Sequence, residues 1–538
     1  MQSFLRFRNV GRAAEANVNQ PEQFSQAPKD EERAQAGTFT APRAISDVHL
    51  EAATRTKSNG MTAADSSYGM ALARSMAGVH LRDASTYRGL SGPIFIVSWE
   101  GPDDPLNPRN WSVTKRVIVT LQVGLISAAV GAAFGIDATA LPQAAKEFGV
   151  SDVVESLATG IGVGSLFAGP FSETFGRNAV YIGSMLIFAI WIMGAGLSPN
   201  IGAQLAFRFL AGCCGSTPIL WLWRIYPGAI MGAYIAPSEV MNWRWVEWII
   251  LILSGILLLL VLLFMPETYG PVLLHWRASH YRRITGDSRF YSEHELTGAT
   301  FLHRLKVSMS RPFLMLTEPI IMAMTLYITV LYIILFTFLV GWPYIFEKTY
   351  GINQCLANTI FVAMFLGMQF FYVLVPFIYN KTAHAIRLSE SPEEFKRLKF
   401  SPEIRLRYAM LGTAIAIPVS LFWMGWTATA DISIWSPIIA SALFGFGVTG
   451  VFICTYLYII DSYEVYSASA LTFASLVRYI AAGGMTVVGI PFYENMGTDY
   501  TLTIMACISL ALVPIPYLLY FYGHRLREKS KYAVSWDS

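Results

Sequence analysis

Apolar segments of membrane-spanning length follow one another from about residue 117 almost to the end of the chain, and no other feature constrains the fold as strongly. A helix needs about 20 residues to cross a hydrocarbon layer about 30 Å thick. The chain is 54% hydrophobic and 14% charged, whereas a soluble chain carries about 25% charged residues. The sequence therefore predicts an all-α membrane protein. Eleven convincing spans lie at residues 117–141, 153–172, 179–197, 201–223, 243–265, 319–342, 355–379, 408–427, 435–460, 467–491 and 500–522.

A twelfth segment, at residues 225–240, makes a poor membrane helix. Short cytosolic loops collect Lys and Arg and external loops do not, so the charge distribution tests whether this segment crosses. With a cytosolic N-terminus and the segment counted, the internal connections hold 23 Lys and Arg residues and the external ones hold three. If this segment did not cross, every later loop would lie on the other side of the membrane, and the basic loops would face outward. The charge pattern therefore predicts twelve crossings, with both termini in the cytosol. The residues that weaken the segment are Pro227, Gly228, Gly232, Pro237 and Glu239.

The predicted crossings form two groups of six around a cytosolic loop, which is the ground plan of many secondary transporters. A net charge of +3 gives no reason to expect a nucleic-acid partner. The expected parts are a mostly disordered cytosolic tail at 1–98, an N-terminal transmembrane bundle at 99–265, a cytosolic central loop at 266–318, a C-terminal transmembrane bundle at 319–523 and a cytosolic tail at 524–538.

No enzyme chemistry is visible in the predicted spans. All eight histidines lie in tails or loops, and the five cysteines lie in or beside apolar stretches, so we expect neither a metal site nor a cofactor. The chain also lacks a GxxxxGK[ST] loop for binding ATP phosphates. Uphill transport by such a chain would therefore use an ion gradient.

A charge within a predicted span is costly and suggests a functional role, and three such residues are candidates for one. Arg208 lies near the middle of its span, Arg478 about eleven residues into the penultimate span, and Asp137 in the outer third of the first. The estimated depths of Arg208 and Asp137 differ by only about 5 Å, within reach of an arginine side chain. We therefore predict that these two residues form a proton-coupling pair. The alternative is that each charge only holds helices together.

The stretch from Gly169 to Asn178 reads G-P-F-S-E-T-F-G-R-N and connects the second and third predicted spans. Gly169 allows helices to approach closely, and Gly176 permits a tight turn. Glu173 and Arg177 place an acid and a base at a helix end. The cluster predicts an inner gate that locks when closed, and it resembles the loop signature G-x-x-x-[DE]-x-x-G-R of the major facilitator superfamily.

Further motifs resemble the same superfamily. The stretch R-F-L-A-G-C-C-G-S, which holds Arg208, resembles its fourth-span motif. The run W-E-G-P-D-D-P-L-N-P-R-N-W, from Trp99 to Trp111, is more specific and resembles the signature ahead of the first span in the fungal drug:proton antiporter branch. In this order and spacing the motifs extend the resemblance over about residues 95–530. The remaining matches are P-E-T-Y-G-P-V-L-L from Pro266, S-A-L-F-G-F-G from Ser441, Y-I-I-D-S-Y from Tyr458 and S-A-S-A-L from Ser467.

The resemblance implies the major facilitator fold, in which two six-helix bundles surround a central cavity and alternate access to the two sides. It further implies proton-coupled efflux of a small hydrophobic or toxic organic compound, a drug or a secondary metabolite, by a monomer in the plasma membrane. The expected partners are therefore the small substrate, protons and the lipid bilayer. A nutrient or polyamine transporter of the same fold is the alternative.

The chain departs from the family in its fifth span. The antiporter signature G-P-x-x-G-G keeps only Gly228 and Gly232, and residues 201–242 leave almost no turn between two crossings. The second span also looks a turn or more too short. Two interpretations remain: a missing segment that leaves an inactive product, or a short hairpin that inserts and works with altered coupling.

Several side chains of the C-terminal bundle are candidates for lining a substrate cavity. Tyr327, Tyr332 and Met368 would contact a hydrophobic substrate, and Arg478 would neutralise an anionic one. For each of the three uncharged residues, contact with lipid or with neighbouring helices is the more common alternative.

Overall fold

The computed structural model describes residues 1–19, 76–83, 92–149, 171–172, 174–215, 225–235, 242–296, 301–387, 402–407 and 409–533. These residues form two compact units. Unit 1 comprises Met1–Arg116 and Pro266–Ala299, and unit 2 comprises Val117–Met265 and Thr300–Ser538. Within unit 2 we call the first stretch the N half and the second the C half. Seven helices of the described residues are long and apolar enough to cross a membrane.

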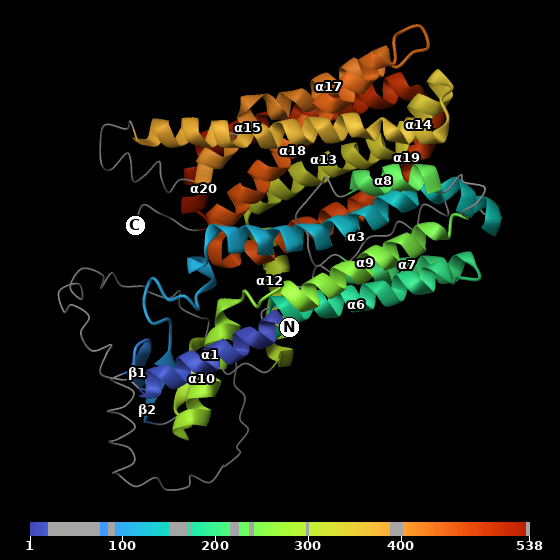
Figure 1. Cartoon of the computed structure of the whole chain (residues 1–538). Coiled ribbons are helices and arrows are strands. Elements are labelled where there is room, and N and C mark those ends of the chain that lie inside the picture. The colour runs from blue at the N-terminus through green and yellow to red at the C-terminus, as the bar shows by residue number, and fades with distance from the viewer. Residues whose placement is uncertain are drawn as a thin grey trace. The chain divides into compact units, whose positions relative to one another are not determined.

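The N half of unit 2 is built around α6, which packs against both α7 and α9 (Figure 1). Its apolar core includes Ala133, Phe188 and Val246, all of them buried. The helices of this half are α3 (Val113–Phe148, which begins in unit 1), α6 (Arg177–Gly196), α7 (Ile201–Gly215), α8 (Ile225–Ile235) and α9 (Trp245–Phe264).

The C half has a larger core, in which α13 packs against α19, and α18 packs against α15 and α17 (Figure 1). The backbone of α19 leaves the helical conformation at Gly497, so this element is two helices joined at a kink. The helices are α12 (Phe301–Leu314), α13 (Pro319–Pro343), α14 (Gln354–Thr359), α15 (Phe361–Arg387), α17 (Ala414–Thr427), α18 (Trp435–Tyr463), α19 (Ser467–Leu512) and α20 (Pro514–Glu528).

Glycines set how closely the helices of the C half approach. Gly445 of α18 lies against the backbone oxygen of Met364 in α15, where a Cβ atom would clash. A Cβ at Gly447 would lie 2.9 Å from the backbone oxygen of Thr413, just before α17. Both glycines belong to the run S-A-L-F-G-F-G. The motif thus serves close helix packing, the usual role of small residues between membrane helices.

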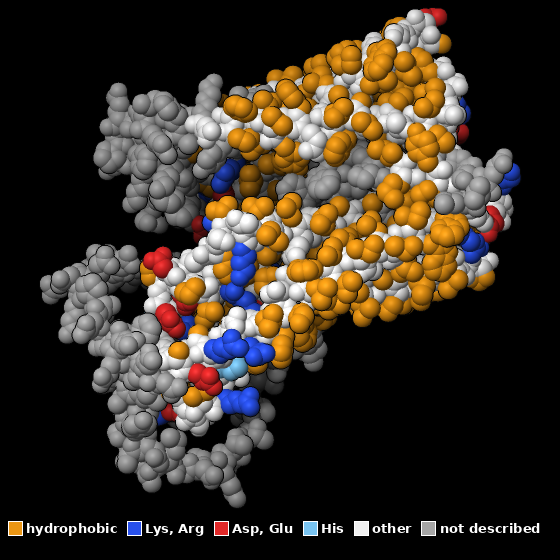
Figure 2. Space-filling model, viewed as in Figure 1, with side chains coloured by type: hydrophobic (Ala, Val, Ile, Leu, Met, Phe, Trp, Pro, Cys, Tyr) orange, Lys and Arg blue, Asp and Glu red, His pale blue; other side chains and the backbone are white. Residues whose placement is uncertain are grey.

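Apolar side chains cover the visible face of the unit 2 helices, and charged side chains gather at their ends (Figure 2). Ile252, Ile256 and Leu259 of α9 are all more than half exposed, as are Val373 and Phe377 of α15. Water would not tolerate so large an apolar surface, whereas lipid does. The surface agrees with the predicted membrane protein.

A helix is present at each predicted span whose residues the structure describes. The predicted spans at 467–491 and 500–522 fall on the two sides of the α19 kink and on α20. The predicted second span, at 153–172, lies almost wholly outside the described residues. The weak fifth crossing contains α8, whose 11 residues extend only about 16 Å. Its flanks, 216–224 and 236–241, lie outside the described residues, so a shortened fifth span stays a prediction.

Unit 1 contains folded parts of residues 1–98; the other residues of this stretch lie outside the described ranges, so a mostly disordered tail stays a prediction. Helix α1 packs against α10, and the strands form one sheet in the order β1-β2-β3, with β1–β2 antiparallel and β2–β3 parallel. These elements lie at α1 (Gln2–Asn19), β1 (Val79–Asp83), β2 (Pro93–Val97), α10 (Gly270–Thr285), β3 (Phe290–Ser292) and α11 (Glu293–Leu296).

The sequence did not indicate these folded parts because their packing partners lie far away along the chain. Ala14 of α1 and Phe95 of β2 share a buried cluster with Tyr281 of α10 and Phe290 of β3. The early segments each contribute few apolar side chains, so their local composition resembles that of a disordered chain. Only the residues that follow Met265 complete the core.

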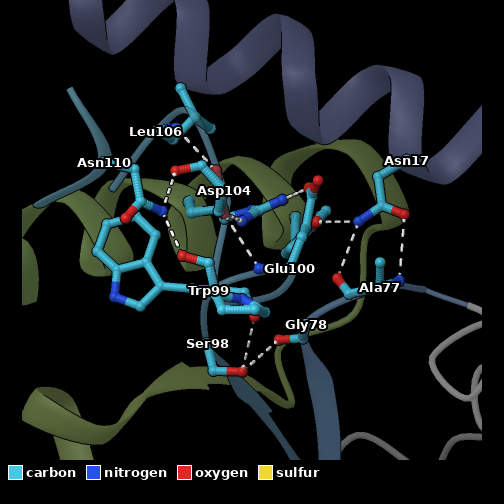
Figure 3. A network of polar contacts seen from close by, with 12 residues as sticks. Asn17, Ala77, Gly78, Ser98, Trp99, Glu100, Asp104, Leu106 and Asn110 are labelled. Atoms are coloured by element: carbon cyan, nitrogen blue, oxygen red, sulfur yellow. Dashed lines mark hydrogen bonds and ion pairs between the residues drawn. The ribbon is translucent and has the colours of Figure 1, made fainter. Parts of the chain in front are cut away.

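The pre-span motif from Trp99 to Trp111 contacts Arg277 of α10. Figure 3 shows Glu100, Asp104 and Asn110 of the motif in a network of polar contacts. Arg277 pairs with Glu100 and, at 3.2 Å, with Asp104. The other carboxylate oxygen of Asp104 accepts a hydrogen bond of 2.7 Å from the Leu106 backbone, and the Asn110 amide donates to the Asp104 carbonyl oxygen at 3.0 Å. The side chains of Arg277 and Asp104 are each only 1% exposed. The motif thus joins the segment before the first span to the loop between the halves.

Candidate functional site

A buried ion pair joins α7 to α9 in the N half. The guanidinium of Arg208 donates a hydrogen bond to the carboxylate of Glu247. The side chains are 6% and 1% exposed, so both charges are removed from solvent. A buried pair of this kind is neutral overall, whereas either charge alone would be very costly in the membrane.

The local structure explains why these two side chains meet. Arg208 is the eighth residue of α7 and Glu247 the third of α9. Helical side chains lean toward the N-terminus of their own helix, so Arg208 reaches back toward the start of α7. Gly196, the last residue of α6, leaves room beside the pair, because a Cβ there would lie 3.2 Å from the Cβ of Glu247.

A second polar cluster fixes the neighbouring helix ends. Arg244, just before α9, pairs with Glu147 of α3 at 2.9 Å and donates to the backbone oxygens of Gly196 and Ser198 at 3.2 and 3.1 Å. The indole of Trp243 also donates to Glu147. Partial burial raises the pKa of Glu147, but the hydrogen bonds from Arg244 and Trp243 outweigh it and lower the pKa. Glu147 thus stays ionised at neutral pH and holds the ends of α3, α6 and α9 together.

The sequence predicted a different partner for Arg208. The predicted partner was Asp137, whose side chain lies outside the described residues. The pairing of Arg208 with Asp137 therefore stays a prediction. Glu247 was missed because it lies near the start of a span, where an acid normally faces the interface. The signal that could have found it is an acidic residue inside the segment Trp245–Phe264, which has the highest mean hydropathy of the candidate spans.

The predicted inner gate is described only in part. Gly169 and Glu173 lie outside the described residues. Gly176 precedes α6 with φ 89°, a conformation that favours glycine, and Arg177 is exposed at the start of α6. The next residue, Asn178, is buried and donates a hydrogen bond of 2.8 Å to the Met265 backbone oxygen after α9. The sequence pattern assigned Asn178 no role, yet it ties the start of α6 to the end of α9.

The two remaining glycines of the antiporter signature lie on α8, and both are buried. Gly228 lies against the backbone oxygen of Ala132 in α3, where a Cβ would clash. A small residue is therefore required at this position for α8 to pack on α3. Gly232 lies one turn further along the same helix.

Helix α8 also packs against α14 and α15, so it joins the N half to the C half. The hydroxyl groups of Tyr234 in α8 and Thr359 in α14 lie 2.9 Å apart. The amide of Gln143 in α3 donates to the side-chain oxygen of Gln354 in α14 at 3.1 Å. The halves therefore meet at the end of the bundle that carries α14.

Arg478 of α19 lies in a cage of aromatic rings in the C half. Its guanidinium carbon is 4.4 Å from the ring centre of Tyr332 in α13 and 4.8 Å from that of Tyr479. The rings of Phe452 and Tyr456 in α18 lie at 5.9 and 5.5 Å. The Tyr456 hydroxyl accepts a hydrogen bond from Arg478.

The other two cavity candidates, Tyr327 and Met368, are 2% and 0% exposed and belong to the packed core of the C half. Their burial favours a packing role in this conformation, and a substrate role for them stays a prediction. Within the described part of the chain, no cluster of three or more His, Cys, Asp or Glu residues is placed to hold a metal ion.

Comparisons with known proteins agree on one family. Residues 227–486 match the family model of the Major Facilitator Superfamily. The chain is 45% identical over 487 residues to the MFS-type transporter kojT of Aspergillus flavus, which covers 84% of this chain and 86% of the relative. It is 31% identical over 482 residues to the MFS-type efflux pump MFS2 of Trichophyton rubrum, covering 84% and 79% of the two chains.

A solved structure shares the fold. The proton:xylose symporter XylE bound to 6-bromo-6-deoxy-D-glucose superposes with a TM-score of 0.53 at 12% sequence identity, covering 77% of this chain and 96% of that one. At so low a sequence identity, the superposition shows only that the two proteins share a fold. Together with the membrane-length helices and the matching relatives, it shows that the chain belongs to the major facilitator superfamily and is an integral membrane transporter of small molecules rather than an enzyme.

Proposed function

We propose that this transporter exports small hydrophobic organic compounds in exchange for protons. In this proposal it works in the plasma membrane, with both termini in the cytosol, as the distribution of basic residues suggests. Relatives named as efflux pumps support the direction of transport. The observation that carries the proposal is the buried Arg208–Glu247 pair, because it places a titratable carboxylate against a fixed positive charge.

Proton binding at Glu247 changes the charge of this buried site. The ionised pair is neutral overall, but a proton on Glu247 leaves Arg208 as an uncompensated buried cation. Breaking a buried pair costs about 3 to 5 kcal/mol. Since about 1.4 kcal/mol changes an equilibrium tenfold, the protonated N half would favour a conformation that hydrates Arg208 by about a hundredfold or more. Proton binding from one side and release to the other would then drive the cycle.

The remaining predicted residues have roles that follow from this scheme. Asp137 would be a second proton carrier in the same half. The segment that holds Gly169, Glu173, Gly176 and Arg177 would form the inner gate, at the opposite end of α6 from the Arg244–Glu147 contact. The contact of α8 with α14 and α15 supports a state in which the halves are closed at that outer end.

An export assay tests the proposal. Cells expressing the full chain are loaded with a panel of fluorescent hydrophobic compounds, and efflux is followed at external pH 5 and pH 8. Efflux should be faster at pH 5, and Arg208→Ala and Glu247→Gln should abolish this difference while the proteins still reach the membrane. The matched control is Asp431→Asn, an acid-to-amide change at an exposed position, which should leave efflux unchanged.

Three results would contradict the proposal. Accumulation rather than loss of the compounds would indicate an importer, such as a nutrient or polyamine transporter. Unchanged pH-dependent efflux in Glu247→Gln would remove this carboxylate from the coupling. Correct membrane insertion with no transport of any compound would favour an inactive product, and sequencing transcripts across codons 155–245 would then reveal a longer form.

A further inference from the structure

Arg208 and Arg478 are buried near the middle of their predicted spans, and their charges are compensated in different ways. Arg208 has the carboxylate of Glu247. Arg478 is 1% exposed, and its side chain donates hydrogen bonds to Tyr456 and, at 3.3 Å, to the Ser475 hydroxyl. Both acceptors are neutral. Among the described residues, no carboxylate lies within ion-pair distance of Arg478, and its Nε atom has no hydrogen-bond partner.

The aromatic cage offsets only part of the cost of burying this cation. Each ring face attracts the guanidinium electrostatically, and a desolvated cation–π contact is favourable but weaker than a buried ion pair. A guanidinium offers five N–H donors, and here one buried donor stays unsatisfied. The site therefore has an uncompensated positive charge and a vacant donor, both of which an anion would satisfy.

The location of the cage suits a transported molecule. Arg478 is the twelfth residue of α19, about 17 Å from the start of the helix, and this is about half the thickness of the hydrocarbon layer. Tyr332, Tyr456 and Tyr479 are each partly exposed, so the cage borders a surface that a ligand can reach. The rings come from three helices, α13, α18 and α19, and a ligand among them would contact all three.

We propose that Arg478 and its aromatic cage bind an organic anion with a flat ring, such as an aromatic carboxylate. The carboxylate would accept hydrogen bonds from the guanidinium, and the ring would stack among Tyr332, Tyr456 and Tyr479. Inorganic anions share the charge but gain nothing from the rings. This inference deepens the proposed function by naming a class of substrate. It rests on the proposed function only where it takes the bound compound to be the exported compound.

A binding experiment on the unmodified chain tests the inference. The purified full chain is placed in lipid nanodiscs at pH 7, and binding of radiolabelled benzoate is measured without a proton gradient. Unlabelled benzamide, acetate and chloride then compete: benzamide has the ring without the charge, and the other two have the charge without the ring. Benzamide should compete about ten- to a hundredfold more weakly than benzoate, since it lacks the charge that strengthens the hydrogen bond. Acetate and chloride should also compete more weakly, because they lack the ring that contacts the cage.

Variants identify the residue responsible. Arg478→Gln should remove the preference for benzoate over benzamide, Arg478→Lys should keep part of it, and Tyr332→Leu should weaken benzoate binding through loss of the ring contact. The matched control is Arg407→Gln, because Arg407 also lies over a tyrosine, Tyr520, with ring centre 5.7 Å away, but belongs to no cage. It should bind benzoate like the unmodified chain.

The inference is overturned if benzoate does not bind, if benzamide or chloride competes as strongly as benzoate, or if Arg478→Gln keeps the full preference. Should Arg478→Gln fail to fold, the competition series on the unmodified chain decides. Failure of the proposed function would look different, because Glu247→Gln protein should bind benzoate normally while losing proton-dependent export. The test of benzoate binding is therefore independent of the coupling mechanism.

Discussion

Single buried charges give this transporter its most specific chemistry. Arg208 and Arg478 were recognisable from the sequence, because a charged residue deep in an apolar span is costly and rarely accidental. The partners of these two arginines were not recognisable from the sequence. Apart from the adjacent Tyr479, the partners come from segments between about 20 and 150 residues away, and no local pattern states which helix faces meet.

The Arg208–Glu247 pair yields a stability prediction. Glu247→Leu should lower the free energy of unfolding by about 3 to 5 kcal/mol, because it leaves Arg208 buried without a partner. Replacing both residues, as Arg208→Met with Glu247→Leu, should restore most of that loss, since two apolar side chains can pack in place of a buried pair. Thermal unfolding of the full chain in detergent measures both effects.

The double variant separates structure from coupling. It should be nearly as stable as the unmodified chain and yet show no pH-dependent export, because it has no titratable group at this position. If the double variant were less stable than Glu247→Leu alone, the two side chains would not act as a pair. If it retained proton-dependent export, the pair would be structural only.

At the scale of elements, apolar composition and length located the transmembrane helices where the structure describes them. The folded parts of residues 1–98 could not be located in this way, because α1 and the strands are completed by α10 and β3. The glycines of α18 were visible as a motif. Their role in packing became clear only from the structure, because a Cβ on these glycines would meet the backbone of α15 and the backbone just before α17.

Close packing of α15 on α18 yields a second prediction. Gly367 of α15 lies against the backbone oxygen of Ala442 in α18, so Gly367→Ala should force the two helices apart and reduce both the yield of folded protein and its melting temperature. The control is Gly255→Ala in α9, where a Cβ would meet nothing within 4 Å. Equal stability of the two variants would contradict the close packing of α15 on α18.

The ion-pair cluster at α11 yields a pH prediction. Burial raises the pKa of Glu295, but hydrogen bonds from His275, Arg282 and the Ser292 backbone outweigh it and lower the pKa to about 2. Because the folded pKa lies below the ordinary value of 4.5, ionised Glu295 stabilises unit 1. The stabilisation is complete above about pH 4.5 and is lost as the pH falls toward about 2.

Glu295→Gln should therefore weaken unit 1 by about 2 kcal/mol at pH 7 and have little effect near pH 2. Hydrogen exchange of residues 270–296 in the full chain, compared with the unmodified chain at each pH, measures this. Glu293→Gln is the control, because the Glu293 side chain is 75% exposed. An equal effect of Glu295→Gln at both pH values would show that its charge is not responsible.

On the scale of the whole molecule, the order and spacing of short motifs along the chain indicated the family, and the comparisons confirm it. The motifs could not indicate the substrate, because selectivity depends on side chains that converge from several helices. They also gave no sign that the pre-span motif serves unit 1. That role rests on the contact between Arg277 and Asp104, which lie 173 residues apart.

Proton flux measured together with substrate flux tests the central claim most directly. The full chain is reconstituted into liposomes that contain a pH-sensitive dye. A concentration gradient of a compound that the expressing cells export is then imposed. The unmodified chain should move protons against the direction of the compound, and Glu247→Gln should move none. Movement of the compound without protons, or an undiminished proton flux in Glu247→Gln, would contradict proton exchange through the Arg208–Glu247 pair.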